Sequence, residues 1–234
     1  MTEMTTAHSA SSGIHRRARH PLTAVAVSVA TGAVLLVLGL VMKANPADLP
    51  VVVALNQHHT GLVGTLTSGI YKALEPVYAV VLVAVLAAAV WAVSRSFKTA
   101  IAFGAVVGLT WLPSAILKYV VERPRPELSA LSHPYSPWQT DASFPSGHTA
   151  FIVALTVTFC FLLRGTRWVP LVAALGTVAT VVVGLAVMVN GLHYPTDVLA
   201  SILWSLAMAP TARWIVVDLI LARFGAKGRR RAAA

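Results

Sequence analysis

Long apolar stretches separated by short polar segments run through most of the chain. A helix of about 20 apolar residues is long enough to cross a bilayer. Six stretches are predicted as membrane-spanning helices on this ground: 22–42, 76–94, 99–121, 147–163, 168–189 and 197–221. Pro113 and Pro210 interrupt two of them, where a proline kinks a helix and frees a carbonyl group that neighbouring helices can satisfy. The pattern therefore predicts an all-α polytopic membrane protein, with a bundle of six transmembrane helices in residues 22–221.

The composition favours the same class of protein. The chain has 234 residues, of which 57% are hydrophobic and 11% charged, whereas a soluble domain carries about a quarter charged residues. The formal net charge of +10 does not indicate nucleic acid binding, because the basic residues lie beside apolar segments and are not clustered with aromatic residues on a soluble domain. The single cysteine, Cys160, lies within an apolar stretch and is interpreted as a packing residue.

The distribution of basic residues predicts the orientation in the cell membrane, since Lys and Arg concentrate on the cytoplasmic side. Residues 1–21 and 222–234 are interpreted as basic cytoplasmic tails. With both termini inside, the inner side collects 12 of the 18 Lys and Arg residues: Arg16, Arg17, Arg19, Arg95, Lys98, Arg164, Arg167, Arg223, Lys227, Arg229, Arg230 and Arg231. The first outer loop, 43–75, contains His58 and His59, but no carboxylate or cysteine stands at ligand spacing. We therefore expect a solvated loop and no metal site.

The first polar cluster follows the third apolar stretch and contains Lys118, Arg123 and Arg125. A lysine near a helix end can simply extend to the interface, but this leaves the two arginines unexplained. Pro124 and Pro126 restrict the backbone around them. Guanidinium and ammonium groups held in this way suit the oxygen atoms of a phosphate.

The second cluster, Pro145-Ser146-Gly147-His148, opens the fourth apolar stretch. Proline and serine are typical of a helix start, and the free N–H groups of a first helical turn can bind an anion. Gly147 would let a ligand approach the backbone closely, and His148 would lie beside it. The alternative is an ordinary capped helix with a histidine at the membrane interface.

The third cluster places His193 four residues before Asp197 at the start of the sixth stretch. Pro195 suits the first helical turn, so the chain can bring the carboxylate to the imidazole. Asp197 would then fix the tautomer and leave one ring nitrogen as a nucleophile. The alternative is a carboxylate that interacts with the helix dipole beside an incidental histidine.

Together the clusters predict metal-free phosphoryl transfer without a cofactor. His193 would attack phosphorus, Asp197 would orient it, and His148 would protonate the leaving oxygen and then activate water. Cations and backbone N–H groups would hold the phosphoryl oxygens, and they come from Lys118, Arg125, Ser146 and Gly147.

These residues resemble the motifs of the type 2 phosphatidic acid phosphatase superfamily. Lys118, six residues and Arg125-Pro126 match its first motif, Pro145 to His148 match its second, and His193 with Asp197 matches the second half of its third. The resemblance covers roughly residues 70–221. It implies a six-helix membrane bundle with an outward-facing site for lipid phosphates or diphosphates, and the same roles for His193, His148 and Asp197.

The third motif departs from the family pattern at its start, where Ala186 and Val187 replace the family's Ser-Arg. Losing one charge-assisted donor to a transition state costs on the order of 10²–10³ in rate. Asn190, one helical turn after Val187, or Arg123 would be auxiliary residues that compensate.

Two functions follow from this sequence. The leading hypothesis is an outer-leaflet phosphatase acting on polyprenyl diphosphate, phosphatidic acid or phosphatidylglycerol phosphate, with the bilayer and the lipid phosphate as its partners. The alternative is a lipid-phosphate binding or transport protein with weakened catalysis, which Val187 favours and the complete set of His193, His148 and Asp197 opposes. Oligomeric state does not follow from the sequence.

Overall fold

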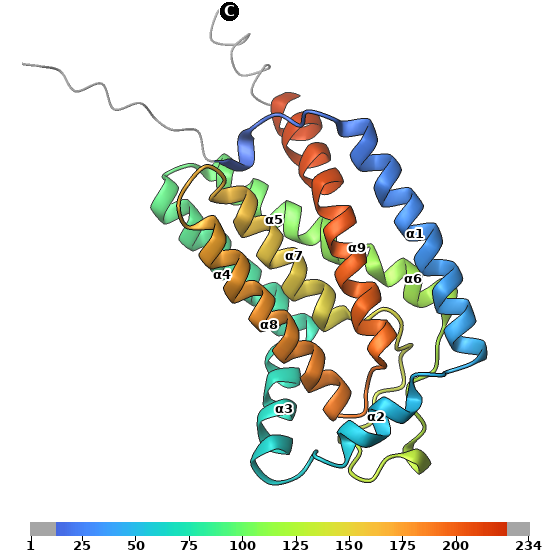
Figure 1. Ribbon diagram of the computed structural model, residues 1–234. Helices are drawn as coiled ribbons and strands as arrows, with labels where there is room; N and C mark the ends of the chain where they lie inside the picture. Colours follow the sequence, from blue (N-terminus) through green and yellow to red (C-terminus); the bar gives the residue numbers. More distant parts are fainter. Residues whose placement is uncertain (1–12, 224–234) are drawn as a thin grey trace, which may run out of the picture.

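The computed structural model describes residues 13–223; parts of the two predicted tails, 1–12 and 224–234, lie outside the described residues. The described residues form helices and connecting segments, with no strand among them (Figure 1). Its α-helices are α1 (Pro21–Ala44), α2 (Leu49–Asn56), α3 (Gly61–Ala73), α4 (Pro76–Ser94), α5 (Phe97–Trp111), α6 (Ser114–Val121), α7 (Gly147–Leu162), α8 (Val169–Val189) and α9 (Pro195–Arg213). The 3-10 turns η1 (Gly13–His15) and η2 (Leu128–Ala130) and the π-helical segment η3 (Trp214–Leu221) complete the fold.

The predicted all-α membrane architecture is confirmed. Within residues 13–223, five helices or continuous helix pairs are long and apolar enough to cross a membrane: Pro21–Ala44, Pro76–Ser94, Phe97–Val121, Val169–Val189 and Pro195–Leu221. The remaining predicted span corresponds to α7, which is apolar but has only 16 residues.

Both interrupting prolines mark a change in the helices. Pro113 separates α5 from α6, because it has no N–H group with which to continue the helical hydrogen bonds. Pro210 lies inside α9, and the chain passes into the π-helical η3 shortly afterwards, at Trp214.

Helix α7 forms the centre of the bundle and packs against α5, α8 and α9 (Figure 1). Its Phe151 is fully buried in a cluster that also contains Phe103 of α5. The outer helices α1 and α4 instead expose large apolar side chains, such as Val29 and Val93. Exposed apolar stripes of this size are stable where lipid covers them.

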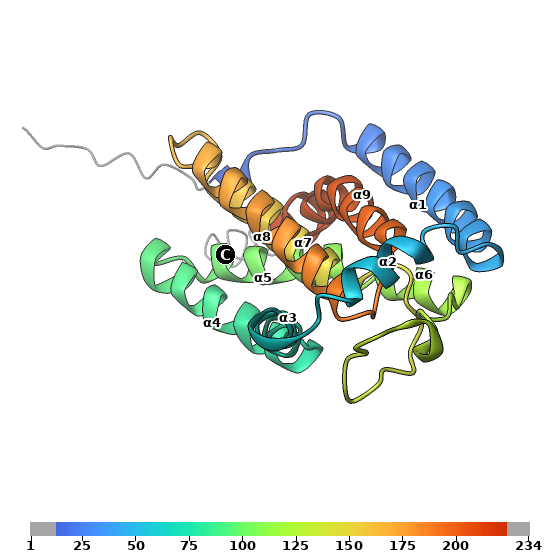
Figure 2. The same ribbon diagram turned by 60° about the horizontal axis from the view of Figure 1, so that its bottom comes forward.

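The two ends of the bundle differ in character. The described chain ends lie together at one of them, where His15 of η1 hydrogen-bonds Thr99 at 3.1 Å and Arg213 donates to the carbonyl of Ile14 at 3.0 Å. At the opposite end lie α2, α3 and the long connection 122–146 (Figure 1), and Figure 2 brings that end forward. The three polar clusters all belong to this second end.

Candidate functional site

The three sequence clusters converge on one cavity of about 530 Å³. Lys118 at the end of α6, His148 at the start of α7 and His193 before α9 all line it, together with Arg125. Helix ends therefore position Lys118, His148 and His193, whereas Arg125 comes from the connection that follows α6. The convergence predicted from the sequence is present in the fold.

His193 is 1% exposed and held from both ring nitrogens. Its Nε2 lies 3.3 Å from Nη1 of Arg125, and its Nδ1 lies 3.3 Å from Oδ2 of Asp197. A guanidinium group only donates hydrogen bonds, so Nε2 is the acceptor and Nδ1 carries the proton. Burial, reinforced by the positive charges of Arg125 and Lys118, lowers the pKa of His193 well below its usual value. The ring is therefore neutral near pH 7, with its lone pair on Nε2.

Asp197 lies at the third position of α9 and is fully buried. Its Oδ2 accepts the backbone N–H of Tyr194 at 2.9 Å as well as the contact with His193. Its Oδ1 accepts Nη1 of Arg123 at 2.7 Å. The two oxygens are thus held from opposite sides, which fixes the rotation of the carboxylate.

His148 stacks on the ring of Tyr71 from α3, with ring centroids 4.2 Å apart. Its Nε2 lies 3.1 Å from the backbone carbonyl of Tyr71, which accepts only, so this nitrogen carries a proton. Nδ1 is then the nitrogen available for proton exchange. The sequence did not indicate Tyr71, because nothing in the local pattern of α3 shows which helix it will face.

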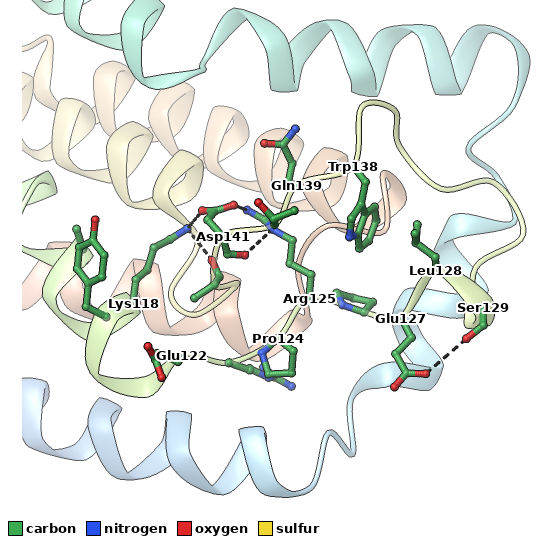
Figure 3. A pocket seen from close by; sticks show the side chains of 16 residues that line it. Lys118, Glu122, Pro124, Arg125, Glu127, Leu128, Ser129, Trp138, Gln139 and Asp141 are labelled. Atoms are coloured by element: carbon green, nitrogen blue, oxygen red, sulfur yellow. Dashed lines mark hydrogen bonds and ion pairs between the residues drawn. The ribbon is translucent and has the colours of Figure 1, made fainter.

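Asp141 joins the two cations of the first cluster (Figure 3). Its Oδ2 lies 2.8 Å from Nζ of Lys118 and its Oδ1 lies 2.6 Å from Nη2 of Arg125. Burial opposes ionisation of this carboxyl group, but the charges of Lys118 and Arg125 outweigh that effect and hold its pKa below the usual range. Sequence reasoning missed Asp141 as a site residue, although a lone carboxylate four residues before Pro145 was a usable signal.

A second, larger cavity of about 850 Å³ lies on the other side of this ion-pair group. Lys118, Arg125 and Asp141 line both cavities. Figure 3 shows the Asp141 carboxylate between the two cations, with Trp138 and Leu128 further along the same cavity.

Ser146 and Gly147 were both predicted to hold phosphoryl oxygens, but only Gly147 of the two lines the cavity. The side chain of Ser146 caps α7 by accepting the backbone N–H of Thr149 at 3.4 Å, and its own N–H donates to the carbonyl of Asp197 at 3.3 Å. Ser146 is therefore engaged in holding α7 and α9 together. Gly147 lines the cavity, and a Cβ atom there would meet nothing within 4 Å.

Arg123, one of the two predicted auxiliary residues, lines the larger cavity together with Lys118 and Arg125. Neither Arg123 nor Asn190 is among the described residues that line the cavity with His193. Arg123 is bound to Asp197 and Asp48, so the suggestion that it replaces the family arginine as a phosphate ligand does not fit this structure. The amide of Asn190 is fully buried and donates to the carbonyl of Thr67 at 3.3 Å, which places it against α3.

Val187 is fully buried in an apolar cluster with Tyr71, Tyr135 and Leu192. Its carbonyl accepts the N–H groups of Leu192 and His193, at 3.1 and 3.3 Å. The position expected to hold an arginine is therefore a packing and turn-forming position next to the candidate nucleophile.

No group of three or more His, Cys, Asp or Glu residues within 13–223 is arranged to hold a metal ion. His59, one of the two histidines of segment 43–75, hydrogen-bonds the carbonyl of His133 at 2.6 Å and the hydroxyl of Ser68 at 2.9 Å. The first of these contacts joins segment 43–75 to the connection 122–146.

Residues 98–220 match the family model of the PAP2 superfamily. The chain belongs to the PAP2 superfamily. The match includes every residue that the sequence motifs singled out. Helices α1 to α4 precede it, so Asp48 and Tyr71 contact the PAP2 site from outside the matched segment.

One curated protein and one solved structure are similar to the chain. Undecaprenyl-diphosphatase BcrC of Bacillus subtilis (strain 168) is 30% identical over 129 residues, which is 53% of this chain and 63% of that protein. The chain thus spans less than two thirds of this curated relative. The crystal structure of a transmembrane PAP2 type phosphatidylglycerolphosphate phosphatase from Bacillus subtilis superposes with a TM-score of 0.65 at 21% identity, covering 81% of this chain and 93% of that one. That likeness concerns the fold.

Proposed function

We propose that this PAP2 protein hydrolyses a lipid phosphate or diphosphate through a phosphohistidine intermediate. The observation that carries the proposal is the state of His193: a buried neutral imidazole whose Nε2 lone pair lies beside Arg125 and whose Nδ1 proton is directed at Asp197. A nucleophile, an orienting carboxylate and a fixed cation are the parts that covalent phosphoryl transfer requires.

In the first step, Nε2 of His193 attacks phosphorus in line and the bond to the leaving oxygen breaks. Lys118 and Arg125 bind the phosphoryl oxygens as their charge redistributes. The imidazole becomes cationic, and Asp197 stabilises it through the Nδ1 proton. His148, protonated on both nitrogens for this step, donates a proton from Nδ1 to the leaving oxygen.

In the second step, His148 accepts a proton from water, and the resulting hydroxide attacks the phosphohistidine. The P–N bond breaks, inorganic phosphate leaves and His193 returns to its neutral form. Every proton and electron pair in this cycle comes from substrate, water or these residues.

The substrate class follows from the surroundings of the site. Lys118 and His148 lie at the ends of apolar helices, so an amphiphile can keep its tail in lipid while its phosphate enters the cavity. The names of the two relatives, an undecaprenyl-diphosphatase and a phosphatidylglycerolphosphate phosphatase, support polyprenyl diphosphates and glycerophospholipid phosphates as substrates. The excess of Lys and Arg at the opposite end of the bundle supports six spans, cytoplasmic termini and a site on the outer face of the cell membrane.

Phosphate release from a panel of lipid phosphates by the purified protein tests the proposal, with His193→Ala as the matched control. We expect release from at least one lipid, persisting in excess chelator, and none from the variant. Equal rates for the two proteins on every lipid would refute hydrolysis. Saturable binding of those lipids would then favour the alternative, a lipid-phosphate binding or transport protein, for which the buried Val187 is the supporting observation.

A further inference from the structure

Arg123 is a buried cation that takes no part in the chemistry described so far. It follows α6 directly and is 1% exposed. Its Cζ lies 3.7 Å above the ring of Tyr194, and its Nε has no hydrogen-bond partner within residues 13–223. An arginine this deeply buried is retained in a fold when specific partners hold its charge.

Two carboxylates are those partners. Nη1 donates to Oδ1 of Asp197 at 2.7 Å, and Nη2 donates to Oδ1 of Asp48 at 2.6 Å. Thr196 links them further, because its hydroxyl accepts from Arg123 and its backbone N–H donates to Oδ2 of Asp48 at 3.0 Å. The guanidinium group thus bridges the start of α9 to the residue that precedes α2.

Asp48 comes from a part of the chain that the family match does not include. It directly precedes the short helix α2, which lies near the start of α9 (Figure 2), and its carboxylate accepts from Thr196 instead of capping α2. Burial opposes its ionisation, but the hydrogen bonds from Thr196 and Arg123 outweigh that effect and lower its pKa. Asp48 is therefore ionised at neutral pH.

The net charge of Arg123, Asp48 and Asp197 acts electrostatically on His193. A single arginine paired with Asp197 alone would cancel the charge of that carboxylate. With Asp48 sharing the same guanidinium group, two carboxylates face one cation, and the group keeps one net negative charge. That charge lies on the Nδ1 side of His193, where positive charge develops when Nε2 bonds to phosphorus.

We propose that Arg123 and Asp48 are positioning residues for His193, acting through Asp197; this inference rests on the proposed phosphohistidine chemistry. Arg123 fixes the rotation of the Asp197 carboxylate by holding Oδ1, so that Oδ2 is directed at Nδ1. Asp48 prevents Arg123 from neutralising that carboxylate. The pair acts on the formation of the intermediate and leaves substrate binding to Lys118 and Arg125.

The direct test is Asp48→Asn, which keeps the shape of the side chain and removes its charge. Removing a group that orients a functional side chain typically costs on the order of 10- to 100-fold. We expect a loss of this size in kcat and in the rate of phosphohistidine formation in a rapid-quench experiment with radiolabelled substrate, with KM changed by less than about twofold. Arg125→Gln should instead raise KM.

Asp218→Asn is the matched control. Asp218 is also a mostly buried carboxylate, with a side chain 16% exposed against 11% for Asp48, and it pairs with Arg213 at the opposite end of the bundle. It should keep the wild-type kcat. Wild-type kcat in Asp48→Asn, or a loss confined to KM, would overturn the proposal.

Charge rescue separates positioning from a merely structural role. Arg123→Gln leaves two buried carboxylates without their cation, whereas the double variant with Asp48→Asn restores one net negative charge. The double variant should therefore exceed Arg123→Gln in kcat per folded molecule, as measured on monodisperse protein. A double variant no faster than the single one would contradict the charge argument.

A measurement that does not depend on turnover tests the positioning role separately from the proposed hydrolysis. Nitrogen NMR of histidine-labelled protein, assigned with His193→Ala, should show the Nδ1-protonated tautomer of His193 in the wild type and a mixture in Arg123→Gln. Identical tautomers in the two proteins would overturn the positioning role even if the enzyme is active. An inactive wild type with the expected tautomers would refute only the proposed function.

Discussion

The carboxylate of Asp141 is bonded to the guanidinium group of Arg125 at 2.6 Å and to the ammonium group of Lys118 at 2.8 Å. Asp141 is therefore bound to both of the cations that the proposed chemistry assigns to a substrate phosphate. A phosphate group entering the cavity has to displace this carboxylate or share its partners. The side chain of Asp141 is 56% exposed, so displacement into solvent is open to it.

Asp141→Asn should strengthen the binding of inorganic phosphate as a competitive inhibitor, because the variant removes the competing negative charge. Exposed ion pairs are worth about 0.2–1 kcal/mol, which corresponds to an inhibition constant lower by a factor of roughly 1.4 to 5. The measurement is the inhibition constant of inorganic phosphate for hydrolysis of one lipid substrate, in the wild type and the variant. Weaker inhibition would mean that Asp141 mainly orients the two cations.

Asp197→Asn should abolish most turnover without preventing substrate binding. The amide cannot accept hydrogen bonds from Tyr194 and Arg123 and also fix the Nδ1 proton of His193. Removing a histidine-orienting carboxylate from a hydrolase costs on the order of 10³–10⁴ in kcat. Steady-state kinetics in detergent checks this, and a variant within tenfold of the wild type would show that His193 does not depend on Asp197.

The acid limb of kcat/KM should lie below pH 6.5 if His193 is the nucleophile. Its pKa is lowered by burial and by the charges of Arg125 and Lys118, so the reactive neutral ring persists as the pH falls through the usual histidine value. Arg125→Gln removes one of these charges, which raises the pKa and moves the limb to higher pH. The profile is corrected for the substrate's own ionisation, and an unmoved limb would assign it to another group.

Gly39→Ala should destabilise the end of the bundle that holds the candidate site. A Cβ atom at Gly39 of α1 would lie 2.8 Å from Phe144 and 2.9 Å from Val121, which is closer than packed carbons approach. Overpacking of this kind costs about 1–3 kcal/mol, seen as a lower Tm in detergent. Gly69→Ala in α3 is the control, since its Cβ would meet nothing within 4 Å, and an equal shift in both variants would contradict the packing argument.

Much of the architecture was predictable because membrane helices are specified locally. The stretches 76–94 and 168–189 correspond closely to α4 and α8, since length and apolarity alone decide whether a helix can cross a bilayer. The stretch 147–163 also matches α7 (Gly147–Leu162) to within one residue, although this helix has only 16 residues. Its central position in the bundle makes it the helix most covered by protein and least dependent on contact with lipid.

The site was predictable only as a set of residue types. The spacing of Lys118, Arg125, His148, His193 and Asp197 indicated phosphoryl transfer, and the fold does bring these residues together. Asp141 and Tyr71 were not identified, because each acquires its partner across a long separation in sequence. The assignment of Arg123 to the phosphate was also not supported, since the structure places that side chain between two carboxylates.

Arg123 and Arg125 have different roles that the sequence alone does not distinguish. Both precede a proline in the same turn, and nothing local distinguishes them, so the sequence determined that two cations would emerge at this end of the membrane domain. Only the tertiary structure decided their roles. Hydrogen bonds from Thr196 at the start of α9 hold Asp48 beside Arg123, while the connection 122–146 directs Arg125 to His193. Whether a segment can cross a membrane depends on its own length and apolar composition. The partner of a buried charge depends instead on which distant segments fold beside it.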